Sequence, residues 1–363
     1  MAIKEHVIIA GGGLFGLTSA IVLAENGYKV TVIEKNNDIL KEASLVNQNR
    51  IHYGYHYPRS IATGKEALEG LPSFKEYYGN CINDSFTKYY AVAKKGSLLT
   101  AEEYVAFCDE LDIQLNEEWP TEAILNRDLL EMCWKVYEPV FDYHTLRIDI
   151  LKRLNVNKSI RILRNAQIEN IERFPNNRIK VMLNNGYNLD GNFLVNATYS
   201  GLTDVLKLFN EQILKANYEL LVLPILKIKE SIAPFGITIM DGPFCSLVPR
   251  GFVKDEYILS HVKLSVIQSH LGYSKPEWNI FDGIVEKEII ENCKQYFPIL
   301  DEMEYQESWI TTKIVLPQQD IDDARPTLLL EHGENICSVF SGKVTTCVLA
   351  ANKILAKVNK LFK

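Results

Sequence analysis

The segment HVIIAGGGLFG, from His6 to Gly16, decides how the chain begins to fold. Residues His6 to Ala10 predict a short strand that is apolar on both faces, as in the middle of a parallel sheet. Glycines follow at once, and Leu14 to Asn26 has helical apolar spacing that Gly27 ends. Lys29 to Glu34 predicts a second strand. A strand, a helix and a strand in so short a stretch indicate a right-handed βαβ unit with a parallel sheet.

The glycines of this unit fit the motif GxGxxG. Gly11 permits the tight turn, Gly13 lets the backbone approach a pyrophosphate, and Gly16 allows the helix to pack closely on the strand. The motif alone is also compatible with a plain glycine turn. Glu34 favours a dinucleotide site, because a carboxylate at the end of the second strand accepts hydrogen bonds from an adenosine ribose. The predicted contacts at this end are Gly11, Gly13, Leu14, Phe15, Gly16, Glu34 and Lys35.

The rest of the chain predicts two interleaved parts. Helices are expected at 100–111, 142–155 and 280–296, and from the Gly342-Lys343 turn to the end, with a capping box formed by Thr100 and Glu103. Strands are expected at 89–92, 161–163, 167–172, 178–183, 193–198, 236–240, 245–248, 257–262 and 336–340. Both ends resemble one doubly wound sheet, so we expect residues 1–85, 139–214 and 316–363 to form a nucleotide-binding domain. Residues 86–138 and 215–315 would form an inserted substrate domain.

Composition excludes some classes of function. The 363 residues carry 39 Lys and Arg against 46 Asp and Glu, a net charge of −7 that argues against a general nucleic-acid binder. The seven cysteines form no CxxC pair and no zinc-type spacing, so we expect no metal site, reduced thiols and a cytoplasmic location. The uncharged run from Val7 to Ala24 has the length of a short membrane span, but its glycines argue against one.

Three further segments extend the pattern to the middle and the end of the chain. Phe340 to Thr346, FSGKVTT, predicts a strand, a glycine turn and a helix start. Leu194 to Thr198 reads LVNAT and is followed by Tyr199. Ser44 to Ser60 reads SLVNQNRIHYGYHYPRS and contains two histidines four residues apart.

With these segments the chain resembles the D-amino-acid-oxidase-like superfamily of FAD-dependent oxidoreductases, particularly its glycerol-3-phosphate dehydrogenase and L-2-hydroxyglutarate dehydrogenase branches. The resemblance implies an α/β fold: a doubly wound, Rossmann-like FAD-binding domain with an inserted mixed α+β substrate domain built on an antiparallel sheet. In the family a similar Gly-Lys-x-Thr-Thr segment brings a helix N-terminus to the flavin, where its positive end stabilises the charge of the reduced ring. Tyr199 stands where the family's Asn-Ala-Thr-Gly segment has glycine, and Gly201 follows two residues later.

The resemblance also implies the remaining cofactor contacts. The segment from Ser44 to Ser60 would run beside the flavin, and the Asn-Ala-Thr strand end would lie near the pyrophosphate. The implied contacts beyond the first βαβ unit are Ser44, Asn49, Arg50, His52, Thr198, Gly342, Lys343, Val344, Thr345 and Thr346.

Catalysis would follow the cofactor's chemistry, in which a hydride passes from a carbon bearing nitrogen or oxygen to flavin N5. A base near neutrality suits the accompanying proton transfer, which makes His52 and His56 candidates for catalysis or flavin contact. Core histidines and covalent flavin attachment are the alternatives. Arg325 and Arg250 are candidates for an anionic substrate group, against surface ion pairs, and Tyr57 is a candidate for lining the pocket.

The predicted substrate is a small amine, amino acid or hydroxy acid, with an anionic group as a possibility. One alternative is a nicotinamide-dependent dehydrogenase, but that alternative assigns no function to the Gly342–Thr346 segment. A second is a non-catalytic FAD-binding module. The last helix has lysines on one side and apolar residues on the other, which favours packing on the core over contact with an anionic membrane.

Overall fold

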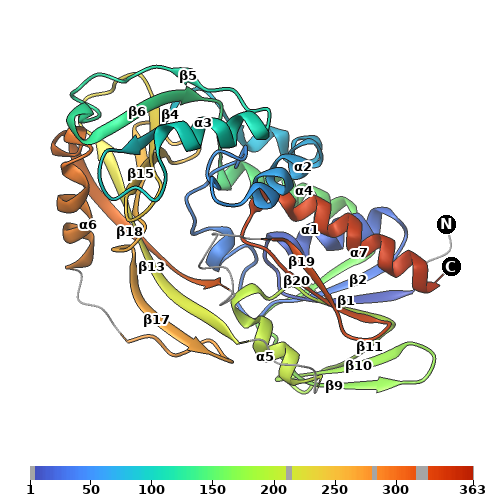
Figure 1. Cartoon of the computed structure of the whole chain (residues 1–363). Coiled ribbons are helices and arrows are strands. Elements are labelled where there is room, and N and C mark those ends of the chain that lie inside the picture. The colour runs from blue at the N-terminus through green and yellow to red at the C-terminus, as the bar shows by residue number, and fades with distance from the viewer. Residues whose placement is uncertain (1–4, 210–214, 280–283, 316–325, 363) are drawn as a thin grey trace.

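A six-stranded sheet draws its strands from both ends and from the middle of the chain, in the order β19-β20-β12-β1-β2-β8. The computed structural model describes residues 5–209, 215–279, 284–315 and 326–362 (Figure 1). The strands of this sheet are β1 (His6–Ala10), β2 (Lys29–Ile33), β8 (Ile160–Leu163), β12 (Phe193–Asn196), β19 (Leu328–Glu331) and β20 (Ile336–Phe340). All neighbours are parallel except β19, which runs antiparallel to β20. The βαβ unit read from the first residues is therefore confirmed.

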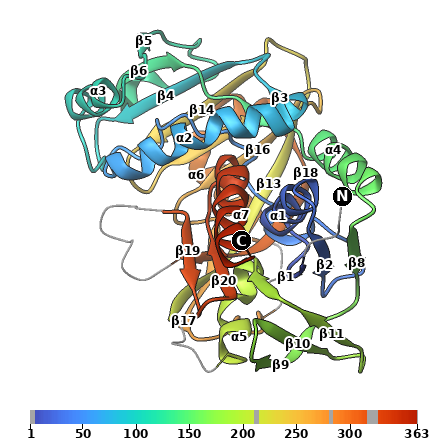
Figure 2. The same cartoon turned by 90° about the vertical axis from the view of Figure 1, so that its right-hand side faces the viewer.

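Layers cover both faces of this sheet, because its central strands are apolar on both sides. Val7 and Ile9 of β1 face the core shared with the helices, whereas Ile8 faces a second core on the opposite side. The helices of the first layer are α1 (Leu14–Glu25), α2 (Ile61–Tyr78), α4 (Tyr143–Val156) and α7 (Cys347–Phe362). The second layer holds β9 (Ile168–Phe174), β10 (Arg178–Leu183), β11 (Asn188–Gly191) and α5 (Leu202–Lys207) (Figure 2).

The last helix turns its apolar side into the first core. Ile354 and Val358 are fully buried there, and α7 packs along α1. Lys357 on the other side forms an ion pair with Glu331 at 2.9 Å. This is the packing that its two-sided sequence favours.

A second, nine-stranded sheet is built from the two inserted segments. Its order is β17-β13-β16-β15-β14-β4-β6-β5, with β18 paired along β13. The strands are β4 (Thr87–Ala93), β5 (Asn116–Glu117), β6 (Leu130–Val136), β13 (Ala216–Ile228), β14 (Phe235–Met240), β15 (Cys245–Pro249), β16 (Glu256–His261), β17 (Val266–Gly272) and β18 (Met303–Val315). Pairing is antiparallel except between β14 and β4, where the two inserted segments meet in parallel. The expected antiparallel sheet is thus confirmed with one parallel joint.

Two helices cover this second sheet, α3 (Ala101–Glu110) and α6 (Val285–Lys294). The capping box at the start of α3 is present: Glu103 N–H donates to Thr100 Oγ1 at 3.2 Å, and Thr100 N–H donates to Glu103 Oε2 at 2.7 Å. A short pair of strands, β3 (Ile82–Asn83) and β7 (Val140–Phe141), lies where the chain returns from one sheet to the other. The limits of the two domains stay a prediction, although the strands of the two large sheets come from the same two sets of segments.

Three helices differ from expectation, and the shortest of them, α5, was not predicted at all. The helix expected at 280–296 begins at Val285 and ends at Lys294, and residues 280–283 lie outside the described part. The 18-residue α2 was not expected, because Gly64, Gly70 and Pro72 interrupt its pattern. Gly64 and Gly70 are both buried in α2, where each meets a close neighbour.

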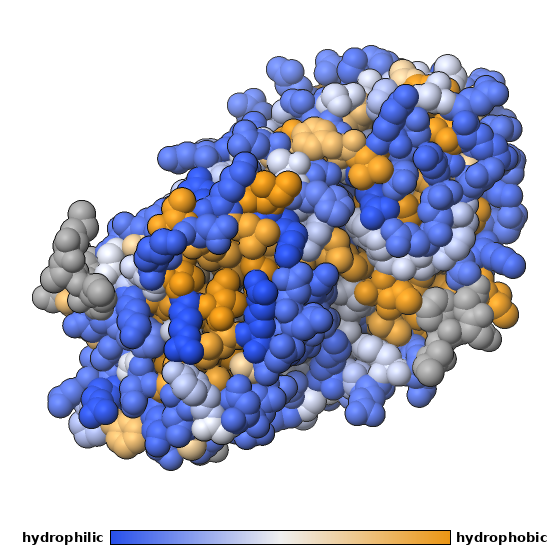
Figure 3. Space-filling model, turned by 180° about the vertical axis from the view of Figure 1, so that it is seen from behind, coloured by the Kyte–Doolittle hydropathy of each residue, from blue (hydrophilic) through white to orange (hydrophobic). Residues whose placement is uncertain are grey.

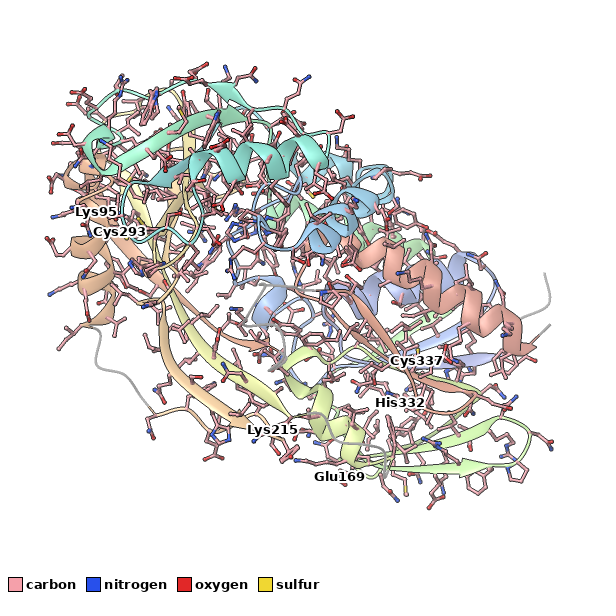
Figure 4. The ribbon with its side chains drawn as sticks, in the orientation of Figure 1. Lys95, Glu169, Lys215, Cys293, His332 and Cys337 are labelled. Carbon is pink, nitrogen blue, oxygen red and sulfur yellow. The ribbon has the colours of Figure 1, made fainter. Side chains whose placement is uncertain are left out.

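All seven cysteines are buried thiols without a disulfide, and Figure 4 shows Cys293 and Cys337 at opposite ends of the molecule. Within residues 5–209, 215–279, 284–315 and 326–362, no helix has the length and apolarity needed to span a membrane. The same residues hold no group of His, Cys, Asp and Glu suited to a metal ion. The face seen in Figure 3 is mainly hydrophilic, with apolar patches between charged side chains.

Candidate functional site

The first glycine turn is packed so closely that side chains have no room. Gly11 has a φ of +103°, and a Cβ there would lie 2.5 Å from the carbonyl oxygen of Ala197, the residue directly after the neighbouring β12. A Cβ on Gly16 would lie 2.0 Å from the carbonyl oxygen of Gly11. The turn and the start of α1 are therefore held at the carboxyl ends of the parallel strands, where this class of sheet binds its ligands.

Both carboxylate oxygens of Glu34 accept backbone hydrogen bonds, one of them from this turn. Its Oε2 accepts the N–H of Gly12 at 2.7 Å, and its Oε1 accepts the N–H of Asn36 at 2.8 Å. The side chain is buried but lines a cavity, together with Lys35. Each carboxylate oxygen has a further lone pair, so the geometry is compatible with the predicted ribose contact.

Two adjoining cavities run from Glu34 to the second sheet. The first has a volume of about 650 Å³ and the second of about 260 Å³. Both are lined by Gly13, Ala43, Ser44, Ala197 and Tyr199. The first is lined further by Gly11, Glu34, Lys35 and Thr198, the second by Leu14, Phe15, Arg50, His52, His56, Tyr57, Gly342 and Val344. This continuity suits an elongated ligand with one end at Glu34.

Ser44 stands at the junction of the two cavities. It ends the short 3₁₀ turn η1 (Glu42–Ser44), and its Oγ accepts the N–H of Leu14 at 3.0 Å. The N-cap of α1 is Gly13, which has no side chain to satisfy that amide. Ser44 therefore holds the amino end of α1 beside the cavities.

Thr198 and Tyr199 follow the strand β12 and lead away from its end. Thr198 Oγ1 donates to Asn196 Oδ1 at 2.6 Å, and Tyr199 has a φ of +51°. The Tyr199 ring stacks on Phe340 with 6.1 Å between the ring centroids. Tyr199 thus adopts the left-handed backbone conformation that glycine takes readily, and it lines both cavities.

The turn at 341–346 presents its backbone to the smaller cavity. A Cβ on Gly342 would meet nothing within 4 Å, and Gly342 and Val344 line the cavity. Lys343 turns the other way: its side chain is fully buried and forms an ion pair with Glu66 of α2. Thr346 Oγ1 donates to the carbonyl of Lys343 at 2.9 Å, so Lys343, Thr345 and Thr346 do not line the cavity with their side chains.

Arg50 lies in a buried network of charges behind the smaller cavity. Its Nε and Nη2 donate to Glu138 Oε2 at 3.1 and 2.9 Å, and its Nη1 donates to Gln48 at 3.2 Å. Tyr90 of β4 lies against both Arg50 and Glu138. The charge of this guanidinium is thus already balanced.

The two histidines stack on each other in the wall of the same cavity. The ring centroids of His52 and His56 lie 5.3 Å apart with 11° between the ring planes, and Tyr57 contacts both rings edge-on. His52 Nδ1 lies 3.2 Å from Glu138 Oε1. The structure therefore brings His52, His56 and Tyr57 together with Gly342 and Val344, as predicted.

The opposite wall of the smaller cavity comes from the second sheet. Leu221 and Leu223 of β13 pair with Thr311 and Trp309 of β18, and Leu221, Leu223 and Thr311 line the cavity. Thr311 Oγ1 is buried and has no hydrogen-bond partner among the described residues. Lys313 also lines the cavity, and its Nζ donates to Glu219 at 2.9 Å.

Arg250 and Asn49 lie outside both cavities, and Arg325 is not among the residues that the structure describes. Arg250 pairs with Glu256 at 2.9 Å and Glu307 at 3.0 Å, stacks on Trp309 and lines neither cavity. Asn49 is buried outside both cavities, with a φ of +55°. Pro326, which follows Arg325 in the sequence, lines the smaller cavity.

Several residues of the site were not predicted from the sequence. Glu138, Tyr90 and Glu66 have no motif around them, and each acts through a partner far along the chain. Thr311 gave no signal either. The alternation of β13 and β18 indicates which of their residues share a face, but only the pairing register shows that this face meets the cavity.

The residues present fit FAD. The larger cavity offers the glycine turn and a carboxylate for an ADP moiety, and the smaller one offers the open backbone at Gly342 for a flavin. The unpartnered hydroxyl of Thr311 is an available hydrogen-bonding group in the same wall.

Comparisons with known proteins agree with this geometry. Residues 6–326 match the family model described as "DAO: FAD dependent oxidoreductase". The FAD-dependent monooxygenase kojA of Aspergillus flavus is 23% identical over 99% of this chain and 87% of its own length. The FAD-dependent monooxygenase FPY4 of Fusarium mangiferae is 33% identical over 31% of this chain and 30% of its own length.

Solved structures share the fold at low sequence identity. L-alpha-glycerophosphate oxidase of Mycoplasma pneumoniae, solved with FAD bound, superposes with a TM-score of 0.79 at 13% identity, covering 98% of this chain and 94% of that one. Glycine oxidase of Geobacillus kaustophilus superposes with a TM-score of 0.76 at 12% identity, covering 98% and 95%. The family match decides for FAD against a nicotinamide cofactor, and the chain belongs to the DAO family of FAD-dependent oxidoreductases.

Proposed function

We propose that the protein removes a hydride from the carbon that bears the nitrogen or oxygen of a small amine, amino acid or hydroxy acid. The observation that carries the proposal is the smaller cavity, where the Gly342 turn, the stacked histidines and the β13/β18 wall meet. FAD, when bound, supplies the hydride acceptor. The protein's own residues bind the substrate, orient its C–H bond and remove the heteroatom's proton.

His52 is our candidate for the proton acceptor. It lines the smaller cavity and is held by Glu138, and an imidazole matches a proton transfer near neutral pH. His56 stacks behind it and fixes the ring plane. Leu221 and Leu223 provide apolar surface that excludes water from the substrate's carbon chain, and Thr311 Oγ1 is available for a polar substrate group.

An anionic substrate group stays a prediction. Arg50 and Lys313, which line the smaller cavity, each already hold a carboxylate at 2.9 Å. We therefore propose Arg325, in the sequence motif Arg325-Pro326, as the residue that binds a substrate carboxylate. The names of relatives span the same range of chemistry: D-amino acid dehydrogenase of Vibrio atlanticus is 48% identical over 15% of this chain and 13% of its own length.

The test is anaerobic mixing of the FAD-loaded protein with separate panels of amines, D- and L-amino acids and hydroxy acids. We expect members of one panel to bleach the visible flavin absorbance and to give the matching imine, keto acid or carbonyl product. A protein that bleaches with none of them, yet inserts oxygen into an added compound when NAD(P)H and air are supplied, would contradict the proposal. It would favour a monooxygenase, the activity named for kojA.

A further inference from the structure

We propose that Glu138 is the positioning residue of the catalytic base: its carboxylate keeps the proton of neutral His52 on Nδ1, so that Nε2 is the nitrogen that accepts the substrate's proton. The inference rests on the proposed function, because it gives His52 its role. It is carried by a contact between two residues that are far apart in the sequence: His52 lies between η1 and α2, and Glu138 lies between β6 and β7.

Glu138 lies between β6 and β7, and its side chain is completely buried. Its Oε1 lies 3.2 Å from His52 Nδ1. Its Oε2 accepts Nε and Nη2 of Arg50 at 3.1 and 2.9 Å and the hydroxyl of Tyr90 at 2.8 Å. Both oxygens therefore have assigned partners, and the orientation of the carboxylate is fixed from two sides.

The network around this carboxylate already contains one cation, the Arg50 guanidinium. Arg50 already balances Glu138, so a second cation on His52 would face the buried guanidinium at short range. Lys88 of β4 also faces the network, with its Nζ 2.7 Å from Thr238 Oγ1 and 5.1 Å from the Tyr90 ring centroid. Burial, reinforced by the charge of Arg50, holds the pKa of Lys88 well below its usual value. His56 and Tyr57 complete the groups that face His52.

Glu138 remains ionised in this setting. Burial by itself raises the pKa of a carboxyl, but the charge of Arg50 and the hydrogen bond from His52 hold the pKa of Glu138 well below its usual range. An ionised carboxylate can only accept hydrogen bonds, so the His52 nitrogen that faces it must carry a proton. In a neutral ring the other nitrogen, Nε2, is then the basic one.

Glu138→Gln is the variant that separates positioning from mere packing. A glutamine has nearly the same shape, but one end accepts hydrogen bonds and the other donates them. Arg50 can only donate, so the amide oxygen would turn toward Arg50 and Tyr90 and leave the NH₂ group facing His52 Nδ1. We expect this to move the imidazole proton to Nε2 and to remove the base.

The direct test is ¹⁵N NMR of the FAD-loaded protein labelled at histidine, with His52 assigned by comparison with His52→Gln. In mildly alkaline buffer we expect the wild-type His52 to carry its proton on Nδ1, and Glu138→Gln to carry it on Nε2. Tyr90→Phe, which keeps the carboxylate and removes one of its other hydrogen bonds, should keep the wild-type tautomer. A wild-type ring protonated on Nε2 alone, or on both nitrogens, overturns the inference even when no variant folds.

The kinetic arm uses the substrate found by the anaerobic panels. We expect Glu138→Gln to lower the rate of flavin bleaching by about 10²-fold or more, the usual scale of a lost general base, with a much smaller change in KM. Glu138→Asp, which keeps an acceptor-only carboxylate, should restore part of the rate. A Glu138→Gln variant with the expected tautomer change and the wild-type rate contradicts the positioning role. If no substrate bleaches the wild-type flavin, the proposed function fails, while the NMR result still decides what Glu138 does to His52.

Discussion

At the scale of single residues, the site depends on carboxylates that organise backbone and cationic groups. Glu34 binds the amides of Gly12 and Asn36, Glu66 holds Lys343, and Glu138 holds Arg50 and His52. The sequence could predict Glu34 because its role follows from a strand end at a known distance from the glycine motif. Glu66 and Glu138 lie at no fixed distance from a recognisable motif. Their partners are distant in sequence, and their burial follows only from tertiary packing.

Glu34→Ala should weaken FAD binding. The change removes the predicted ribose acceptor, a hydrogen bond to a charged group of about 1.5–3 kcal/mol, or about ten- to a hundredfold in Kd. It also frees the amides of Gly12 and Asn36 beside the site. Titration of the apoprotein with FAD measures this loss. Glu117→Gln, an exposed change on β5, is the matched control and should bind FAD as the wild type does. Unchanged affinity in Glu34→Ala would show that the ribose contact lies elsewhere.

The depressed pKa of Glu138 predicts an acid-dependent contribution to stability. Its pKa in the folded state lies well below the ordinary value of 4.5, so the contribution is fully present above about pH 4.5 and is lost as the pH falls through the folded-state pKa. Wild type should therefore be more stable than Glu138→Gln near neutral pH, and the difference should shrink in acid. Urea unfolding at several pH values measures it, with Glu117→Gln as the control. A difference that does not vary with pH would mean that Glu138 is protonated in the folded protein.

At the scale of elements, local patterns predicted those that have complete start and stop signals. The first strand, α1, the capping box of α3 and the strand β20 agree with expectation within a residue or two. The helix α2 was not predicted, because two glycines and a proline lower its helical propensity. Those glycines serve contacts between elements: a Cβ on Gly64 would lie 2.6 Å from Leu111 Cδ1, and one on Gly70 would lie 2.7 Å from the carbonyl oxygen of Thr345.

Gly70→Ala should destabilise the protein and disturb the flavin end of the site. Alanine favours a helix by about 1 kcal/mol, but here its methyl group meets the backbone of the 341–346 turn, which cannot move without shifting Gly342. We expect a net loss of about 1–2 kcal/mol in the free energy of unfolding and weaker FAD binding.

Gly79→Ala provides the control for this change. It lies just after α2, and a Cβ there would meet nothing within 4 Å. Thermal unfolding and FAD titration of the two variants separate a contact effect from a general effect of glycine replacement. Equal behaviour of the two variants would show that α2 and the turn can adjust to each other.

At the scale of the whole molecule, the nucleotide fold and the second sheet are interleaved, and the candidate active site lies where they meet. The sequence predicted this interleaving because both chain ends carry nucleotide-fold signals. It could not predict that β4 and β14 join in parallel, or that β13 and β18 supply the wall opposite Gly342. Those features depend on strand register between distant segments, which a single sequence does not encode in any local pattern.

The same interleaving explains why the net charge of −7 says little about the site. The cavities lie against the amino end of α1 and the turn before α7, whose backbone amides provide local positive potential. Arg50 and Lys343 are buried with carboxylate partners and contribute no net charge there.

The proposed active site is the smaller cavity, in which His52 would remove the substrate's proton. The most direct measurement is the rate of anaerobic flavin bleaching by a reactive substrate in wild type, in His52→Gln and in His144→Gln, an exposed histidine on α4. We predict that all three retain FAD and that only His52→Gln is slowed, by about 10²-fold or more. A wild-type rate of flavin bleaching in His52→Gln, with FAD fully bound, would show that His52 is not the proton acceptor.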